Sequence, residues 1–231
     1  MLMRFSYTAT ATVILDIIAC FLLLGLMQCT KIYRERGKLL DRIFFAMLIS
    51  DMLMAGFDIA VEVFNNEKEV FYHIVTILCA SVMTLVFELL GFLIAQYLCC
   101  LLPQGEDIVK KNFKVFSIPL VASAAMVVLN LFSGFLFRVD PSTGQYMHGP
   151  AYNLIFIPTL IYAVIGVFVL WKVNRLGIIL FLMLLISRIV MEILFTSVSS
   201  TPLILSVVLI YMLVANMNRA FHGEETDAGN N

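Results

Sequence analysis

Charged residues are scarce in this sequence: lysine, arginine, aspartate and glutamate make up 13% of its 231 residues, while 61% are hydrophobic. A soluble domain has about one quarter charged and about one half apolar residues. The composition therefore argues against a soluble protein and predicts a multi-pass protein of the cell membrane, with membrane lipid as its first partner. The net charge of −1 and the lack of a basic stripe exclude nucleic acid as an expected partner.

Catalytic and cofactor motifs are missing as well. The three histidines, His73, His148 and His222, are dispersed and expected on opposite sides of the membrane, which argues against a shared zinc site. The sequence has no H-E-x-x-H, G-x-S-x-G or P-loop motif, and its last apolar run has no lysine for a retinal Schiff base. We therefore expect no enzymatic activity, no cofactor and no metal.

Disulfides are not expected either, because all five cysteines lie within apolar runs. Small, polarizable core residues are the preferred interpretation of these cysteines. The first apolar run, residues 8–30, is too long for the core of a signal peptide and lacks a clear cleavage site. We interpret it as a retained first helix.

Long apolar runs are what the sequence has in abundance. A spanning helix needs about 20 predominantly apolar residues. The predicted spans are residues 8–30, 39–64, 70–102, 113–137, 151–172, 178–198 and 201–217. The predicted fold is thus an all-α membrane protein, a bundle of seven transmembrane helices over residues 1–217. The polar tail 218–231 has nothing to form a core and is expected to be disordered.

Lysine and arginine predict the orientation, because they are enriched in cytoplasmic loops. Eleven of them fall on one side of the predicted membrane and three on the other. The eleven are Lys31, Arg34, Arg36, Lys38, Arg42, Lys110, Lys111, Lys114, Lys172, Arg175 and Arg219; the three are Arg4, Lys68 and Arg138. We predict an outside N-terminus and a cytoplasmic C-terminus.

One predicted outer loop, residues 138–152, is rich in turn residues such as Asp140-Pro141, Gly144 and Gly149-Pro150. It fits a hairpin or lid over the bundle and, equally, a solvated connection. Pro158 should kink the fifth helix unless it lies in the first turn.

The predicted second helix carries Asp51, Asp58 and Glu62, spaced by seven and four residues and therefore on one face. A carboxylate at the centre of a spanning helix costs roughly 2.5–3.5 kcal/mol. This face is therefore expected to point into the bundle or toward a watery cavity. The other intramembrane charges are Asp16, Glu88, Arg188 and Glu192.

At a rise of about 1.5 Å per residue, Asp51, Glu88 and Arg188 lie at a similar depth from the cytoplasmic face. Arg188 is the only basic residue that lies well inside a predicted span, away from its ends. We predict a buried ion pair between Arg188 and Asp51 or Glu88. Such a pair could simply tie helices together without binding any ligand.

The remaining acids lie nearer the outer leaflet. Together with two residues of the outer loop they form a candidate pocket for a ligand or ion, made of Asp16, Asp58, Glu62, Glu192, Tyr146 and His148. A structural role for these acids stays open, but no nearby cation is evident to neutralise them.

Three stretches carry a family resemblance. They are KLLDRIFFAMLISDMLMAGFDIAVEVF (residues 38–64), FRVDPSTGQYMHGPAYNLIF (137–156), and ISRIVMEILF (186–195) with TPLILSVVLIYMLVANMNRAF (201–221). Together they resemble the seven-transmembrane N-terminal sensor region of Firmicute signalling proteins. In that family a cytoplasmic diguanylate cyclase, phosphodiesterase or histidine kinase follows. Here only 14 residues follow Met217, too few for an output domain, so the resemblance implies either a truncated sensor or a stand-alone protein that signals through a partner.

The first functional hypothesis is a receptor-like bacterial sensor. It would bind an unknown small ligand, peptide or lipid between loop 138–150 and the outer acids. Its last two helices would then signal to a cytoplasmic partner or a missing output domain, and a homodimer stays open. The alternative is a small proton- or cation-coupled transporter that uses the same acids with Arg188 as a gate, although no inverted repeat is evident. A structural or assembly role is the third.

Overall fold

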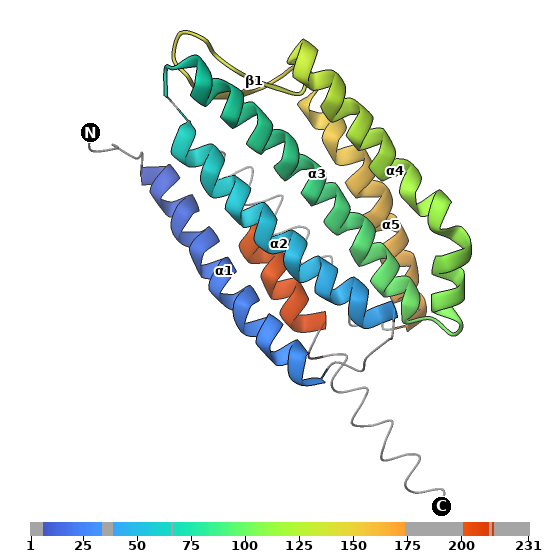
Figure 1. Ribbon diagram of the computed structural model, residues 1–231. Helices are drawn as coiled ribbons and strands as arrows, with labels where there is room; N and C mark the ends of the chain where they lie inside the picture. The colour runs from blue at the N-terminus through green and yellow to red at the C-terminus, as the bar shows by residue number, and fades with distance from the viewer. Residues whose placement is uncertain (1–6, 34–38, 66, 174–200, 213, 215–231) are drawn as a thin grey trace, which may run out of the picture.

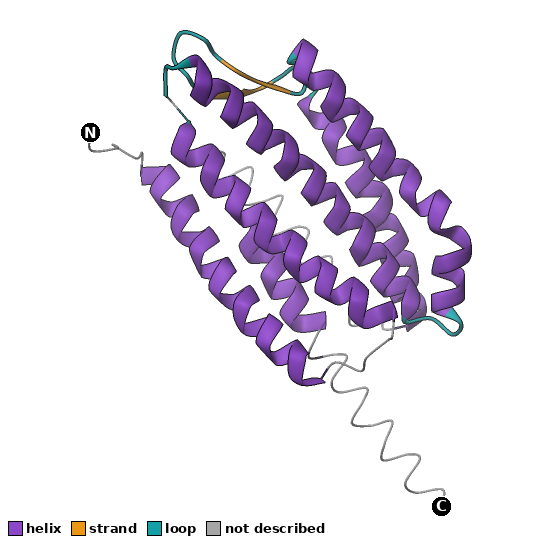
Figure 2. Ribbon diagram, in the orientation of Figure 1, coloured by secondary structure: helices purple, strands orange, loops and turns teal. Residues whose placement is uncertain are grey.

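The computed structural model describes residues 7–33, 39–65, 67–173, 201–212 and 214. Its long helices are α1 (Tyr7–Tyr33), α2 (Leu39–Phe64), α3 (Val70–Cys100), α4 (Gly105–Ser133) and α5 (Phe156–Val173), the last preceded by the 3₁₀ turn η1 (Tyr152–Ile155). A shorter apolar helix covers Thr201–Met212. Consecutive helices run in opposite directions and lie side by side (Figure 1), and nearly all of the described chain is helical (Figure 2).

Five of these helices are long and apolar enough to cross a membrane. This confirms the coarse prediction of a helical protein with the apolar segments of a membrane protein. Of the two last predicted spans, 178–198 lies outside the described residues and 201–217 is described as a helix over Thr201–Met212. The count of seven helices and their orientation therefore stay predictions.

Helix α4 covers most of the predicted fourth span, 113–137, but has different bounds. α4 begins at Gly105 and ends at Ser133, which makes it 29 residues long, or about 43 Å at 1.5 Å per residue. Glu106 and Asp107 occupy its first turn, where negative charge favours the positive end of the helix dipole. Lys110 and Lys111 consequently lie on this helix together with Lys114, which the predicted span already included.

The helices pack through apolar side chains on both halves of the bundle. The larger cluster draws on every long helix and on Thr201–Met212, and the fully buried Leu23, Met47, Leu90 and Leu209 belong to it. A smaller cluster lies around the loop after α4; its buried members are Val61, Ala80, Val127, Leu136, Phe137 and Ile155. Since lipid tails are as apolar as these side chains, close packing and hydrogen bonds must hold the helices together in a bilayer.

The loop between α4 and α5 contains a β-hairpin, which confirms the first of its two predicted forms. Strands β1 (Phe137–Val139) and β2 (Tyr146–His148) are antiparallel, with Phe137 opposite His148 and Val139 opposite Tyr146. In the turn, Asp140 Oδ1 accepts hydrogen bonds from the Ser142 backbone N–H (2.8 Å) and hydroxyl (2.6 Å). The hairpin lies across one end of the bundle, hereafter the hairpin end (Figure 2).

Two asparagines fix the hairpin to the helices. Asn130 of α4 accepts hydrogen bonds from the Leu136 N–H (2.7 Å) and the Phe137 N–H (3.2 Å), and it donates to the Phe137 carbonyl (3.1 Å). Asn65, directly after α2, accepts a bond from the Tyr146 N–H (2.9 Å). β1 is therefore held by a side chain of α4, and β2 by the residue that directly follows α2.

Two further positions explain the geometry at this end. Gly149 donates its N–H to the Leu136 carbonyl (2.7 Å), and a Cβ at this position would collide with the backbone of Phe135. Pro158 is the third residue of α5 and so lies in its first turn, where a proline costs no helix hydrogen bond. Pro158 was expected to kink this helix unless it lay in the first turn, and it does lie there.

Candidate functional site

Four of the predicted site residues come together on α1 and α2. Asp51 and Asp58 are buried on α2, Glu62 is partly buried one turn further along, and Asp16 of α1 is 0% exposed. Asp16 interacts electrostatically with Asp58, Glu62 and Asp51. We call Asp16, Asp51, Asp58 and Glu62 the acidic face. Its two helices, α1 and α2, lie side by side (Figure 1).

The members of the acidic face differ in their hydrogen bonds. Asp51 Oδ2 accepts a bond from the Ser206 hydroxyl (3.1 Å), which also lies 2.9 Å from the Pro202 carbonyl. Asp51 thus ties α2 to the helix Thr201–Met212. Neither carboxyl oxygen of Asp16 has a hydrogen-bond partner among the residues that the structure describes. A hydrogen bond between helices therefore explains why a carboxyl is buried at Asp51. No such bond to described residues explains the buried carboxyl of Asp16.

Tyr146 connects the hairpin with the acidic face. Its backbone is held by Asn65, and its side chain packs against the smaller apolar cluster. Burial raises the pKa of the Tyr146 hydroxyl above its usual range, and interactions with Tyr152 and Asp58 act in the same direction. The phenol is consequently neutral at physiological pH and is a hydrogen-bond donor within electrostatic reach of the Asp58 carboxyl.

A row of aromatic rings continues from Tyr146 to the start of α5. Tyr146 contacts Phe137 at 5.9 Å between ring centroids and His148 edge-on at 5.7 Å. His148 stacks on Tyr152 at 3.6 Å and 7°, and Tyr152 contacts Phe156 edge-on at 5.6 Å. The structure thus brings the predicted residues Tyr146 and His148 together, with Tyr146 half-buried and His148 exposed.

Glu88 belongs to a second polar contact, between α3 and α5. The Thr159 hydroxyl donates a hydrogen bond of 2.7 Å to Glu88 Oε1, and Glu88 is 0% exposed. Glu88 and Asp51 therefore receive hydrogen bonds from different helices. Arg188 and Glu192 lie outside the described residues, so the ion pair of Arg188 with Asp51 or Glu88 stays a prediction.

Sequence reasoning missed Asn65, Asn130 and Thr159, which organise these contacts. The signal for the two asparagines was weak. Each lies near the end of a predicted span, and asparagine side chains commonly form hydrogen bonds with the backbone of a neighbouring loop. Nothing in the sequence distinguishes Thr159 from other threonines in apolar runs. Their partners lie 6 to 81 residues away along the chain.

In the described part of the chain, the side chains of the acidic face are not arranged as a metal site. There, no group of three or more histidine, cysteine, aspartate or glutamate residues is placed to hold a metal ion. Comparisons with known protein families, curated proteins and solved structures gave no match. The resemblance to Firmicute sensor regions accordingly stays a prediction from sequence.

Proposed function

We propose that the protein is a receptor-like membrane sensor, in which the hairpin 137–148 meets a ligand at the outer face of the membrane. The observation that carries this proposal is Tyr146, a half-buried hairpin residue whose backbone is bonded to Asn65 and whose hydroxyl interacts electrostatically with Asp58 of α2. A ligand that displaces the hairpin would change the surroundings of a buried carboxyl. The ligand class stays as broad as the sequence left it: a small molecule, a peptide or a lipid.

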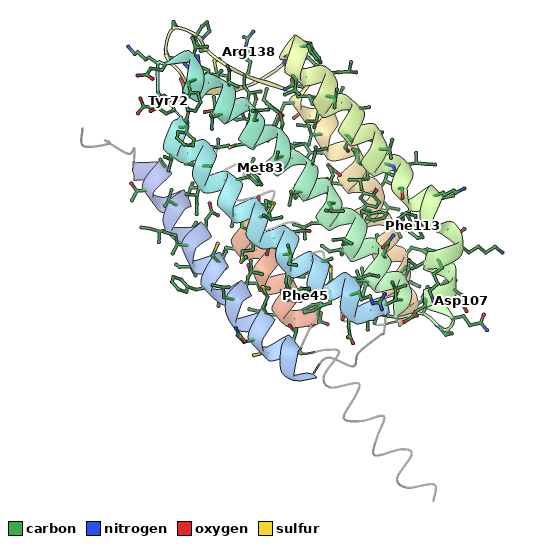
Figure 3. The ribbon with its side chains drawn as sticks, viewed as in Figure 1. Phe45, Tyr72, Met83, Asp107, Phe113 and Arg138 are labelled. Atoms are coloured by element: carbon green, nitrogen blue, oxygen red, sulfur yellow. The ribbon has the colours of Figure 1, made fainter. Side chains whose placement is uncertain are left out.

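The orientation in this proposal rests on the basic residues. Lys111 and Lys172 lie at the end of the bundle opposite the hairpin, as do Arg42, Lys110 and Lys114. Arg138 marks the hairpin end and Asp107 the opposite end (Figure 3). Since basic residues are enriched on the cytoplasmic side, the hairpin end is assigned to the outside.

α2 supplies a route from the hairpin to the chain's last described helix. Asn65, directly after α2, accepts a hydrogen bond from the Tyr146 N–H, and Asp58 of α2 interacts electrostatically with Tyr146, whereas Asp51 accepts a hydrogen bond from Ser206. Asp51 and Asp58 are separated by seven residues, or about 10 Å along the helix. A shift of α2 would therefore change the Asp51–Ser206 bond. The helix Thr201–Met212 would then pass the signal to a cytoplasmic partner or output domain.

The experiment removes the Tyr146 hydroxyl and measures the far end of this route. In Tyr146→Phe and Asp58→Asn proteins in lipid nanodiscs, hydrogen exchange should change both in the hairpin and in residues 201–212. The matched control is Tyr72→Phe, which removes a hydroxyl at the same end of the bundle. Altered exchange confined to the hairpin would refute the proposed route.

A second function, a proton or cation pathway, is favoured by Asp16. A fully buried carboxyl without hydrogen bonds to described residues, next to three other acids, is typical of ion-translocating sites. Reconstituted protein should then carry protons or monovalent cations into liposomes, and Asp16→Asn should abolish the flux. Parent protein without measurable flux would exclude this function.

A further inference from the structure

The backbone ladder of α4 is interrupted in the middle of the helix. Pro119 lies inside Gly105–Ser133. Proline has no N–H, so the bond from residue 119 to the carbonyl of Val115 cannot form, and the ring collides with that carbonyl. α4 is visibly bent along its length (Figure 1), as expected for a helix with an internal proline.

The next bond of the ladder is taken over by a side chain from α5. In a regular helix the Leu120 N–H would bond directly to the Phe116 carbonyl, four residues earlier. Here the Leu120 N–H donates to the Tyr162 hydroxyl (3.1 Å), and that hydroxyl donates to the Phe116 carbonyl (2.8 Å). The phenol oxygen is therefore inserted between the two halves of a helix hydrogen bond.

The tyrosine ring is held closely by α3. Tyr162 is 3% exposed, and a Cβ added to Gly91 would lie 3.1 Å from its Cδ2 atom. Phe92 contacts the ring edge-on, with 6.1 Å between centroids. One turn earlier on α5, Thr159 bonds to Glu88 of α3. Two hydroxyls of α5 thus fix α5 to α4 and to α3.

We propose that Tyr162 is a latch that holds α4 bent, and that α4 has a second conformation in which Leu120 bonds directly to Phe116. In the latched state the hydroxyl makes two hydrogen bonds. In the released state the direct Leu120–Phe116 bond replaces one of them. The Glu88 carboxyl, which interacts electrostatically with Tyr162, offers an acceptor for the other. The two states conserve the number of hydrogen bonds, which is what makes a switch between them energetically accessible.

Release of the latch would move one half of α4 relative to the hairpin. The half after Pro119 is fixed to β1 through Asn130. The half before it, residues 105–118, would change direction. A 20° change over this segment displaces its first residue by roughly 7 Å. This inference is independent of the proposed sensor function, because it concerns only contacts among α3, α4 and α5.

The test measures the distance between spin labels at the exposed residues Lys111 of α4 and Arg42 of α2. The labels are introduced as non-canonical amino acids in the full chain, so that the native cysteines stay in place. Tyr162→Phe keeps the ring and removes the hydroxyl, and the distance distribution should shift by several ångström. Tyr72→Phe is the control and should match the parent. An unshifted distribution in Tyr162→Phe overturns the latch.

Two further variants make the result specific. In a Pro119→Ala background the ladder no longer has its gap, so Tyr162→Phe should shift the distribution less than it does in the parent. An equal shift in both backgrounds overturns the proposal. Gly91→Ala places a Cβ against the Tyr162 ring without removing the hydroxyl. Part of the protein should then show the label-to-label distance of the released state. Its control is Gly56→Ala, because a Cβ at Gly56 has nothing within 4 Å. Identical behaviour of these two alanine variants would count against the latch.

Discussion

Replacement of Asn130 by alanine should release the hairpin while leaving the helices packed. The side chain is 2% exposed and makes three hydrogen bonds, of 2.7, 3.1 and 3.2 Å, to the backbone of Leu136 and Phe137. Each bond contributes about 0.5–1.5 kcal/mol net, and a buried group left without a partner costs about 1–3 kcal/mol. Because alanine leaves three such groups, we expect a loss on the order of 3 kcal/mol in hairpin stability.

Amide hydrogen exchange is the suitable measurement, because the change is local. The N–H groups of Gly149 and Ala151 bond to the carbonyls of Leu136 and Phe135, so their exchange reports on opening of the hairpin. A loss near 3 kcal/mol corresponds to about a 100-fold loss of protection, since 1.4 kcal/mol is a factor of ten. The thermal midpoint of the bundle should change much less, since Asn130 lies outside the larger apolar cluster.

Ser133→Ala provides the matched control. Ser133 lies in the last turn of the same helix, is exposed, and its hydroxyl donates to the Leu129 carbonyl within α4 (2.9 Å). Its replacement should leave the exchange of Gly149 and Ala151 unchanged. If Asn130→Ala loses less than about threefold in protection, or if Ser133→Ala loses as much, the assigned role of Asn130 is refuted.

Two more predictions concern the hairpin. Gly149→Ala forces a Cβ against the Phe135 backbone, which should cost roughly 1–3 kcal/mol by overpacking and speed exchange of the same amides; parental exchange would show that the backbone has room to shift. The Ser142 hydroxyl, followed by the Ser142 N–H, lowers the pKa of Asp140 below its ordinary value of 3.8. A lowered folded-state pKa stabilises the turn above the unfolded pKa, and this contribution is lost as the pH falls through the folded-state pKa. NMR titration should show the shift, and Ser142→Ala should return the pKa toward 3.8, whereas an unchanged pKa in Ser142→Ala would refute this cause.

The sequence predicted apolar helices well where a run had clear polar limits. The span 39–64 coincides with α2, whose run is bounded by charged residues before it and Asn65-Asn66 after it. The span 113–137 and α4 differ in their bounds because hydropathy reports depth in lipid, whereas α4 begins before the apolar run and includes Lys110 and Lys111. A helix can extend beyond the bilayer whenever its first turn is favourable, as Glu106 and Asp107 make it here.

The candidate site was only partly predictable, for a similar reason. Periodicity is a local property, so the spacing of Asp51, Asp58 and Glu62 sufficed to place them along one helix face. The bond between Asp51 and Ser206 joins residues 155 positions apart, and no local pattern encodes it. The turn residues of the loop were compatible with a hairpin and with a solvated connection. The hairpin is held by Asn130 and Asn65, whose side chains bond to backbone groups of the loop.

Asp16 is the residue at which a structural and a functional explanation of the acidic face predict different results. Glu88 and Asp51 each accept a hydrogen bond from another helix, which suffices as a reason for a polar residue between helices. Asp16 is equally buried, yet its carboxyl oxygens have no hydrogen-bond partner among the described residues, and three acids lie nearby. Removing an unsatisfied buried acid should stabilise a protein or leave it unchanged.

Asp16→Asn should therefore have an unchanged or higher thermal midpoint in detergent, and it should lose ion flux or the coupling between hairpin and residues 201–212. Asp51→Asn is the matched comparison, because it weakens a real contact with Ser206 and should lower the midpoint. A residue that costs stability and is kept only for function gives this combination. If Asp16→Asn instead lowers the midpoint as Asp51→Asn does, Asp16 is a structural residue, and the acidic face needs no ligand or ion to explain it.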